Sequence, residues 1–252
     1  MQHFKSLYSN EEYHDTFSNI QTCLRLNDWQ EIGDGTHYLV FHMIGLFSFQ
    51  QWSLKQSIDF MWSYLNKLDI TPDYITIHPD KISEWSNFYK EYYVEIRSDS
   101  DCIWGDGNIS GYCTEFYKHG IEIGNIVNTL DKSIDIGFGL ERLEQVLNID
   151  MIIPNKIEIL EQTYKQLIQD NIMIGHNKQG YLLKKIVNEC ILLGSTIQDN
   201  NFNNVIHNIK QNYQSYLKNI NKNKFKNKEP VFWLDTFGID ISRLEEYKKI
   251  ID

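Results

Sequence analysis

The sequence lacks the features that would place it in a membrane or outside the cell. No apolar run approaches the ~18 residues that a membrane span needs. The first residues, MQHFKSLYSNEEYHD, lack the basic and then apolar layout of a secretory signal. Four cysteines without a CxxC pair, and 8 histidines without an HxxxH pair, indicate neither a disulfide framework nor a zinc-finger type of site. We therefore expect a reduced, cytoplasmic protein with no membrane contact. Cys113 is either a buried structural thiol, which we favour, or a reactive thiol.

Positive charge is also scarce. The chain has 24 Lys and Arg against 34 Asp and Glu, a net charge of −10. This balance argues against a generally basic protein that coats nucleic acid, although a local basic patch would still permit RNA binding. Hydrophobic residues make up 42% of the chain and aromatic residues 13%, which supplies a core and excludes disorder of the whole chain.

Few prolines (4) and glycines (14) mark boundaries, so the elements are predicted from apolar periodicity. Residues 19–26 and 37–49 are apolar, β-branched and aromatic, which predicts two long antiparallel strands joined by a polar loop. Apolar positions recur at helical spacing over residues 54–68. The remaining predicted elements are strands at 74–78, 93–96, 121–130 and 133–136, and helices at 82–92, 140–149, 155–170, 179–193 and 202–220.

The order of these elements predicts an α+β fold, with an antiparallel sheet flanked by helices and followed by a helical region. We place the sheet domain at residues 1–150 and the helical domain at residues 151–252. Residues 99–124 are rich in glycine, aspartate and serine but also contain large aromatic side chains. Large aromatic residues in a glycine-rich loop are typical of the walls of a ligand pocket.

Two charged residues stand where apolar strand residues are expected. Arg25 lies inside the first apolar strand, and Asp135 lies between two isoleucines of a later one. A buried, unpaired charge is costly, so each should meet an opposite charge. For Arg25 that charge is either an internal carboxylate or a bound phosphate or carboxylate, because a guanidinium binds both bidentately. Gly137 and Gly139 would let a ligand approach the backbone closely, and Arg142 opens the next helix.

This last segment, SIDIGFGLERLEQVL, resembles motif 3 of the alanyl-tRNA synthetases, a family of class II aminoacyl-tRNA synthetases. Other landmarks of that family follow the same order. MQHFKSLYS resembles the segment near motif 1, and IQTCLRLNDWQEIG with HYLVFHMIGLFSF resembles the two strands of motif 2. The alanine-site loop is similar to CIWGDGNISGYCTE, and the segment before motif 3 is similar to HGIEIGNIV. Two landmarks of the helical region are similar to KQGYLLKKIV and FWLDTFGIDI.

The resemblance implies an amino-acid-activating ligase that forms an aminoacyl-adenylate, with ATP and Mg²⁺ as cofactors. It implies that Arg25 holds the α-phosphate and the amino-acid carboxylate, and that Asp135 captures the substrate ammonium. Arg142 would cover one face of adenine and reach the γ-phosphate. His37 would contact the triphosphate, and Phe41 would lie against the other face of adenine. Trp104, Asn125 and Gly137 would line the side-chain pocket, and Glu122 would bind Mg²⁺.

The sequence also departs from the family. The Gly-Gly-Lys loop of motif 2 is missing, since only LND separates Arg25 from the tryptophan that follows, and a lysine that helps to hold substrate is lost with it. His42 replaces a family glutamate, and Gly124 replaces a tryptophan. A segment before motif 1, the editing domain and the C-terminal oligomerisation region have no counterpart. The arginine-dense helix that faces tRNA in the family is reduced to Lys184 and Lys185.

These departures shape the functional expectations. Phosphate contacts carry most of the affinity for tRNA, so thinning of that helix favours another acceptor. The acceptor would be a carrier-protein thiol or a small metabolite in a biosynthetic pathway. Alanine is the favoured substrate, ahead of glycine, serine or a β-amino acid. Two alternatives stay open: a minimal alanyl-tRNA synthetase that binds tRNA through Lys184, Lys185 and the Lys218–Lys228 run, and an inactive paralogue that only binds a ligand or partner.

Overall fold

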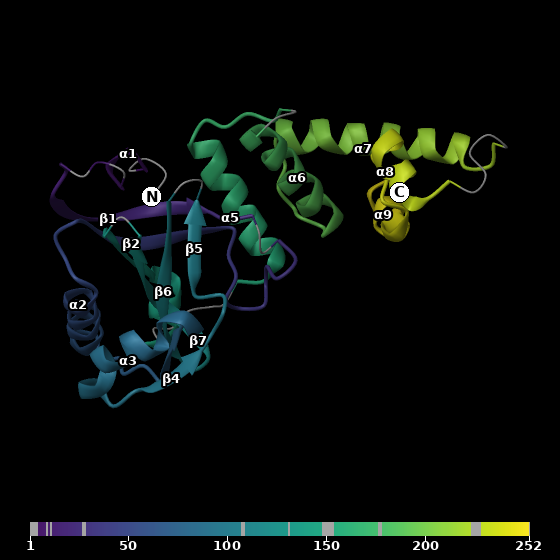
Figure 1. Cartoon of the computed structure of the whole chain (residues 1–252). Helices are drawn as coiled ribbons and strands as arrows, with labels where there is room; N and C mark the ends of the chain where they lie inside the picture. The colour runs from purple at the N-terminus through teal and green to yellow at the C-terminus, as the bar shows by residue number, and fades with distance from the viewer. Residues whose placement is uncertain are drawn as a thin grey trace. The chain divides into compact units, whose positions relative to one another are not determined.

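In the computed structural model the chain folds into two compact units (Figure 1). The first unit contains residues 1–25 and 40–153, and the second contains residues 26–39 and 154–252. The short segment 26–39, which joins two strands of the first unit, therefore belongs to the second. The structure describes residues 5–8, 10, 12–26, 29–106, 109–130, 132–147, 154–175, 178–222 and 228–251.

The first unit is built on an eight-stranded sheet with the order β1-β2-β8-β7-β6-β3-β4, in which β5 also pairs with β6. The pair β3–β4 is parallel, and the other strand pairs are antiparallel. The predicted α+β fold with a mostly antiparallel sheet is confirmed. The strands are β1 (Asp15–Leu24), β2 (Val40–Phe49), β3 (Tyr74–Ile77), β4 (Glu95–Ser98), β5 (Ile103–Asp106), β6 (Ile109–Lys118), β7 (Ile121–Thr129) and β8 (Ile134–Gly139).

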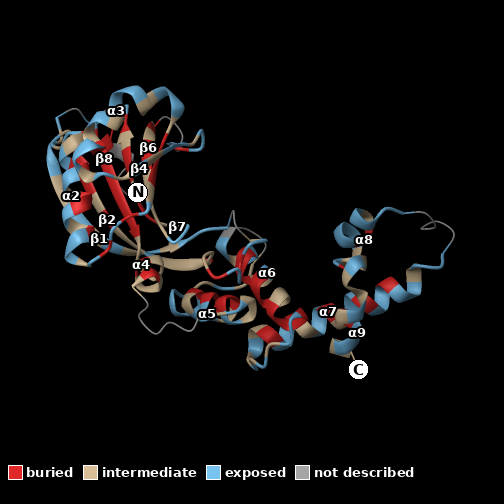
Figure 2. Ribbon diagram, turned by 90° about the horizontal axis from the view of Figure 1, so that it is seen from below, coloured by how far each residue is buried: buried red, intermediate tan, exposed pale blue. Residues whose placement is uncertain are grey.

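Helices cover one face of this sheet. The second helix begins at Ser53, which forms a capping box with Gln56, and its residues Ile58, Met61 and Leu65 recur at helical spacing and are buried. They join a core formed with the strands and the next two helices. In Figure 2 the buried residues of this unit are concentrated on the strands. The helices are α1 (Lys5–Tyr8), α2 (Leu54–Lys67), α3 (Ile82–Tyr89) and α4 (Leu140–Val146).

The two faces of the sheet differ because side chains alternate along each strand. On β8, Ile134, Ile136 and Phe138 belong to the core beneath the helices. Asp135 and Gly137 therefore point to the opposite face. We call this opposite face the glycine face, because it carries Gly45 of β2, Gly137 of β8 directly opposite it, and Gly139 two residues further along β8.

The prediction that residues 99–124 form a loop was wrong. Strands β5 and β6 and the start of β7 occupy most of this segment. The reason is steric, because Gly111 of β6 lies opposite Thr129 of β7. A Cβ atom at Gly111 would lie 2.4 Å from the carbonyl oxygen of Asn128. This glycine permits a close approach of two strand backbones and does not mark a loop.

The second unit is helical, and its core combines apolar faces of all its helices. The helix α7 begins at Asp199, whose carboxylate accepts a hydrogen bond of 3.0 Å from the backbone N–H of Phe202. From there Phe202, Val205, Ile209 and Tyr213 recur at helical spacing and are buried. The helices are α5 (Lys156–Gln169), α6 (Lys178–Leu192), α7 (Asn200–Asn219), α8 (Pro230–Phe237) and α9 (Leu244–Ile251).

The segment 26–39 is part of this helical core. Ile32 and Leu39 are 5% and 1% exposed within it. Gly33 has a φ of +94°, and a Cβ atom there would lie 2.9 Å from the backbone nitrogen of Lys156 at the start of α5. Only glycine suits this left-handed conformation and close contact, which fixes the segment against α5.

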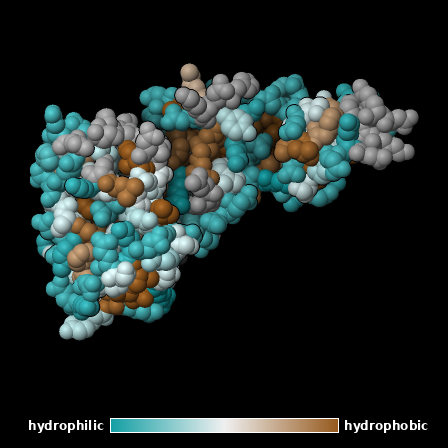
Figure 3. Space-filling model, viewed as in Figure 1, coloured by the Kyte–Doolittle hydropathy of each residue, from teal (hydrophilic) through white to brown (hydrophobic). Residues whose placement is uncertain are grey.

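Hydrophilic residues cover most of the surface visible in Figure 3, with smaller hydrophobic areas between them. Within the described residues, no helix combines the length and the apolar character needed to cross a membrane.

Candidate active site

The glycine face carries a continuous row of aligned residues, one from each strand between β1 and β4. The register pairs the central members directly, since Gly137 of β8 lies between Gly45 of β2 and Asn125 of β7. Neither glycine carries a side chain of its own, but neighbouring side chains cover both, with Phe47 over Gly45 and Met43 over Gly137. A ligand would reach this backbone by displacing one of them. In order across the sheet, the row is Asn19, Gly45, Gly137, Asn125, Glu115, Thr76 and Arg97.

Asp135 lies next to this row and is buried. Its side chain is on the glycine face, opposite Phe47 and Val127 on the neighbouring strands, and the residue is 8% exposed. Burial raises the pKa of its carboxyl to about 7. The described residues include no hydrogen bond or ion pair to this carboxylate. An ionised carboxylate in such surroundings is costly, so a cationic ligand group would be stabilised beside it.

The predicted side-chain pocket residues meet in the same region. A Cβ atom added to Gly137 would lie 3.3 Å from Oδ1 of Asn125 and 2.7 Å from Cε of Met43. Trp104 of β5 packs against two apolar clusters, one with Phe47 and one with Val127, which are the residues opposite Asp135 on the adjacent strands. The structure thus brings four of the predicted residues together, and Met43 occupies the position directly over Gly137.

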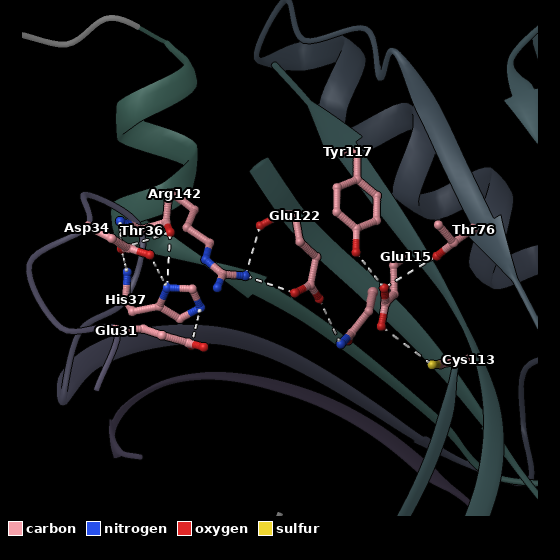
Figure 4. Close-up of polar contacts among 11 residues, drawn as sticks. Glu31, Asp34, Thr36, His37, Thr76, Cys113, Glu115, Tyr117, Glu122 and Arg142 are labelled. Carbon is pink, nitrogen blue, oxygen red and sulfur yellow. Dashed lines mark hydrogen bonds and ion pairs between the residues drawn. The ribbon is translucent and has the colours of Figure 1, made fainter. Parts of the chain in front are cut away.

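Arg142 and Glu122 form an ion pair beside this region (Figure 4). Nη1 of Arg142 donates to Oε2 of Glu122 at 2.8 Å and to its backbone carbonyl at 3.1 Å. The side chain of Arg142 passes over Gly139, where a Cβ atom would lie 3.4 Å from its Cδ. The contacts of Arg142 within the described residues use Nη1 alone, so Nε and Nη2 can donate to a ligand.

Arg25 does not lie inside a strand, and the prediction of a charge buried there was wrong. β1 ends at Leu24, and Arg25 follows it as an exposed residue. Phe41 is half-buried on β2, opposite Cys23, near the same end of the strand pair. Alternation along β2 places Phe41 on the glycine face with Gly45. An exposed guanidinium and an aromatic ring therefore lie at one end of the β1–β2 pair.

His37 belongs to the second unit, within the segment 26–39. Its Nδ1 lies 2.6 Å from Oδ2 of Asp34, and its Nε2 lies 3.5 Å from Oε2 of Glu31. Burial of Asp34 opposes its ionisation, but hydrogen bonds from Thr36 and His37 outweigh this effect and lower the pKa of its carboxyl to about 2. A triphosphate at His37 would meet an imidazole that already contacts an ionised carboxylate.

A comparison with known families decides where the chain belongs. Residues 1–145 match the family model of the tRNA synthetases class II (A), which is more than half of the chain. The chain belongs to the class II (A) tRNA synthetases. Its relatives include the alanine–tRNA ligase of Buchnera aphidicola subsp. Baizongia pistaciae, which is 27% identical over 281 residues, covering 78% of this chain and 32% of the ligase. The alanine–tRNA ligase of Francisella philomiragia is 28% identical over 274 residues, covering 78% of this chain and 31% of the ligase.

This class II chain thus spans about a third of the length of the relatives that it matches. Class II synthetases in general use ATP and Mg²⁺. Mg²⁺ is commonly bound through one or two carboxylates together with substrate phosphates. In this chain both carboxylate oxygens of Glu122 are engaged, Oε2 by Arg142 and Oε1 by Asn125 at 3.3 Å. Each carboxylate oxygen keeps a second lone pair, so Mg²⁺ would share Glu122 with Arg142 and Asn125. Glu122 as a Mg²⁺ ligand stays a prediction.

Two polar residues of the glycine face escaped the sequence analysis. Glu115 lies in the central row, where Oε2 accepts a hydrogen bond of 2.8 Å from the hydroxyl of Tyr117. Asn19 has a buried side-chain oxygen without a hydrogen-bond partner among the described residues. The signal for Glu115 was a run of β-branched and aromatic residues around it, Tyr112, Thr114, Phe116 and Tyr117, which is typical of a strand. The loop assignment hid this signal.

Proposed function

We propose that this class II (A) chain activates a small amino acid, with alanine favoured, by joining it to ATP as an aminoacyl-adenylate. The observation that carries the proposal is the buried Asp135 carboxylate next to the side-chain-free backbone at Gly137. The carboxylate would pair with the substrate ammonium. Met43 Cε lies against Gly137, so only a small substrate side chain would fit there, after Met43 moves aside. A larger substrate would contact Asn125 and Trp104.

In the proposed reaction, a carboxylate oxygen of the amino acid attacks the α-phosphorus of ATP. The new bond is the acyl–phosphate bond, the bond that breaks is the one to pyrophosphate, and no protein nucleophile takes part. The chain would contribute alignment and positive charge. Arg25 would contact the α-phosphate and the attacking carboxylate. Arg142 would contact the γ-phosphate through Nε and Nη2 while Nη1 stays on Glu122.

The remaining assignments place the nucleotide. Phe41 and Arg142 would lie on opposite faces of adenine, and His37 would contact the triphosphate. Mg²⁺, when bound with ATP, would neutralise phosphate charge, but no step above depends on a protein ligand for it. Because motif 2 lacks its lysine, Arg25 is the positive charge at the end of β1. Loss of Arg25 should therefore reduce the rate of amino-acid activation more than loss of His37.

Pyrophosphate exchange with each of alanine, glycine, serine and β-alanine tests the proposal. Asp135→Asn should abolish exchange but leave ATP binding largely intact, because it removes the charge that faces the ammonium and keeps the shape. Loss of one partner of a buried ion pair costs roughly 3–5 kcal/mol. Asp69→Asn, at an exposed site of the same unit, is the matched control and should keep wild-type exchange. No exchange with any of the four amino acids contradicts the proposal.

An inactive paralogue is the competing interpretation, favoured by the missing motif 2 lysine. Calorimetry with a non-hydrolysable alanyl-adenylate analogue separates the two. A chain that activates alanine should bind the analogue, and Asp135→Asn should weaken that binding. If the pocket no longer functions, neither the wild-type chain nor Asp135→Asn should show heat of binding with the analogue.

We further infer that the activated amino acid passes to a carrier-protein thiol or a small metabolite, and not to tRNA. The support comes from α6, where Lys185 lies over the ring of Trp29 at 4.0 Å and Lys184 is only half-exposed. Glu189 of the same helix pairs with Arg243 and Lys156. Residues 223–227 of the Lys218–Lys228 run lie outside the described residues. Labelled alanine offered with tRNA or with a panel of carrier proteins decides between them, and charging of tRNA that falls steeply as salt rises would overturn the inference.

A further inference from the structure

Two thiols and a carboxylate that are separate in the sequence meet beside the glycine face. The Sγ atoms of Cys102 and Cys113 and a carboxylate oxygen of Glu115 all lie within 4.8 Å of one another. Cys102 is fully buried and Cys113 is 4% exposed. The backbone N–H of Cys113 donates to the carbonyl of Cys102 at 2.9 Å, which holds the two cysteines side by side. We call these three residues the thiol–carboxylate group.

We propose that the thiol–carboxylate group binds one divalent ion of the zinc class through both thiolates and the carboxylate. Zinc binds thiolate sulfur at about 2.3 Å and carboxylate oxygen at about 2.0–2.2 Å, so neighbouring ligands of a tetrahedral site are about 3.5–3.8 Å apart. Sγ of Cys113 and Oε1 of Glu115 are already 3.8 Å apart. The third ligand atom, Sγ of Cys102, lies within 4.8 Å of the other two and would approach them by rotation of its side chain. Water completes the fourth position.

A second layer of contacts orients the proposed ligands (Figure 4). The hydroxyl of Tyr117 donates to Oε2 of Glu115 at 2.8 Å, and the hydroxyl of Thr76 does so at 3.3 Å. Oε1 is thereby left facing Cys113. The hydroxyl of Thr76 also lies 2.9 Å from Sγ of Cys102. Such outer hydrogen bonds fix the direction of the ligands and are a regular feature of zinc sites.

The charges around the group are of the sign that a cation requires. Burial, and then the negative charge of Glu122, raise the pKa of the Glu115 carboxyl. Contact with Cys102, and then burial, raise the pKa of the Cys113 thiol. Glu115 makes no ion pair with the described residues, and the cations on adjacent positions are occupied, Arg97 by Glu95 and Lys118 by Asp73. Metal binding releases the thiol protons to solvent, and the positive charge of the bound ion then neutralises the thiolates and the Glu115 carboxylate.

This site is distinct from the proposed ammonium site. Cys113 lies opposite Val127, and Val127 lies opposite Asp135, so two strand spacings, or about 10 Å, separate the two sites. Thiolates are soft ligands that select zinc-class ions, whereas Mg²⁺ prefers oxygen. The inference therefore holds whether or not the chain activates an amino acid.

Titration of the reduced, chelator-treated full chain with Co²⁺ tests the proposal. We expect one equivalent to produce the near-ultraviolet band of thiolate-to-cobalt charge transfer and the intense visible bands of tetrahedral cobalt. Zn²⁺ should displace Co²⁺, and Mg²⁺ should not. Cys102→Ser and Cys113→Ser should each remove most of the charge-transfer band. Thr76→Val, which deletes the outer contacts to Glu115 and Cys102 but leaves all three ligands in place, should weaken binding by about 10–100-fold.

Cys190→Ser is the matched control, because Cys190 is an equally buried thiol in the second unit and should leave the spectrum unchanged. Glu115→Gln keeps the volume of the side chain and provides a test if the serine variants fail to fold. It should weaken binding without removing the thiolate bands. The proposal is overturned if the wild-type chain gives no charge-transfer band. It is equally overturned if Cys102 and Cys113 form a disulfide under mild oxidation while the reduced chain binds no Co²⁺.

Discussion

At the residue scale, the buried Asp135 couples substrate binding to pH. Burial raises the pKa of its carboxyl to about 7, so below that pH the group is largely neutral and cannot pair with an ammonium. We expect KM for the amino acid to fall as pH rises through about 7, while KM for ATP changes little. Initial rates of pyrophosphate exchange over this range provide the measurement. An amino-acid KM that is flat with pH would show that Asp135 does not face the ammonium.

The same carboxyl should make the folded chain less stable at high pH. Its folded-state pKa of about 7 lies above the unfolded value of about 3.9, so its favourable contribution is present at low pH and lost as pH rises between the two values. At about 1.4 kcal/mol per unit, the ionised form costs at most about 4 kcal/mol. Asp135→Asn should therefore raise the free energy of unfolding at pH values above about 7 and change it little near pH 4. Urea unfolding at both pH values checks this, and a variant that is less stable at the higher pH would contradict it.

Gly137 should set the size of the substrate side chain. In Gly137→Ala the new methyl group would meet Cε of Met43 at 2.7 Å, and this flexible side chain can move aside, so the fold should survive. A substrate methyl group would need the same space once Met43 has moved, and the added carbon would occupy it. We expect KM for alanine to rise about 10–200-fold and KM for ATP to stay the same. Gly105→Ala, where a Cβ atom meets nothing closer than 3.7 Å, serves as the control.

At the scale of elements, Gly111 controls the pairing of β6 with β7. A Cβ atom there would lie 2.4 Å from a backbone carbonyl oxygen, which cannot move without breaking the sheet. We expect Gly111→Ala to lower the free energy of unfolding by more than about 3 kcal/mol, in the range of severe core substitutions. Gly105→Ala, in the adjacent strand β5, should cost less than about 1 kcal/mol. Similar losses for both variants would mean that strand propensity, and not the close contact, governs this region.

The sequence predicted most elements well where local pattern and tertiary structure agree. The predicted strands at 19–26 and 37–49 correspond to β1 and β2, and helices such as α2 lie within about one residue of prediction. The error at 99–124 has a physical cause, since the glycine at 111 is required by a strand that pairs from elsewhere in the chain. Arg25 was misplaced for a related reason: apolar residues flank it, but the pairing with β2 stops at Leu24.

The candidate site was predictable where a residue contradicts its surroundings. Asp135 is visible as a charge between isoleucines, and the structure confirms its burial. Glu115 was hidden because its meaning depends on the register of β6 against β3 and β7. The meeting of Cys102 with Cys113 depends on the path of β5 back along β6, which no spacing in the sequence reveals.

At the scale of the whole molecule, each unit has its own core and its own charged network. In the second unit, Glu189 is 12% exposed and pairs with both Arg243 and Lys156. Arg243→Ala leaves this carboxylate with Lys156 alone, 3.7 Å away, and should cost about 1–3 kcal/mol. Hydrogen exchange should then rise in α5, α6 and α9 but not in β2, β7 or β8. Lys249→Ala, at an exposed position of α9, should change neither set, and faster exchange in the sheet of the Arg243 variant would refute this independence.

Residues 26–39 pack into the helical core, so during synthesis their burial must wait until the helices of that core have been made. Ile32 and Leu39 leave the ribosome early, together with the first strands, but α5 and the helices that bury them are translated only after residue 154. Until then these two side chains forgo roughly 1.5–3 kcal/mol each of burial and remain available to wrong partners. A nascent chain halted after the sheet would therefore display an unsatisfied apolar loop, and so would a fragment cut at residue 153. The helical region therefore buries, late in synthesis, apolar side chains of a loop that was synthesised early.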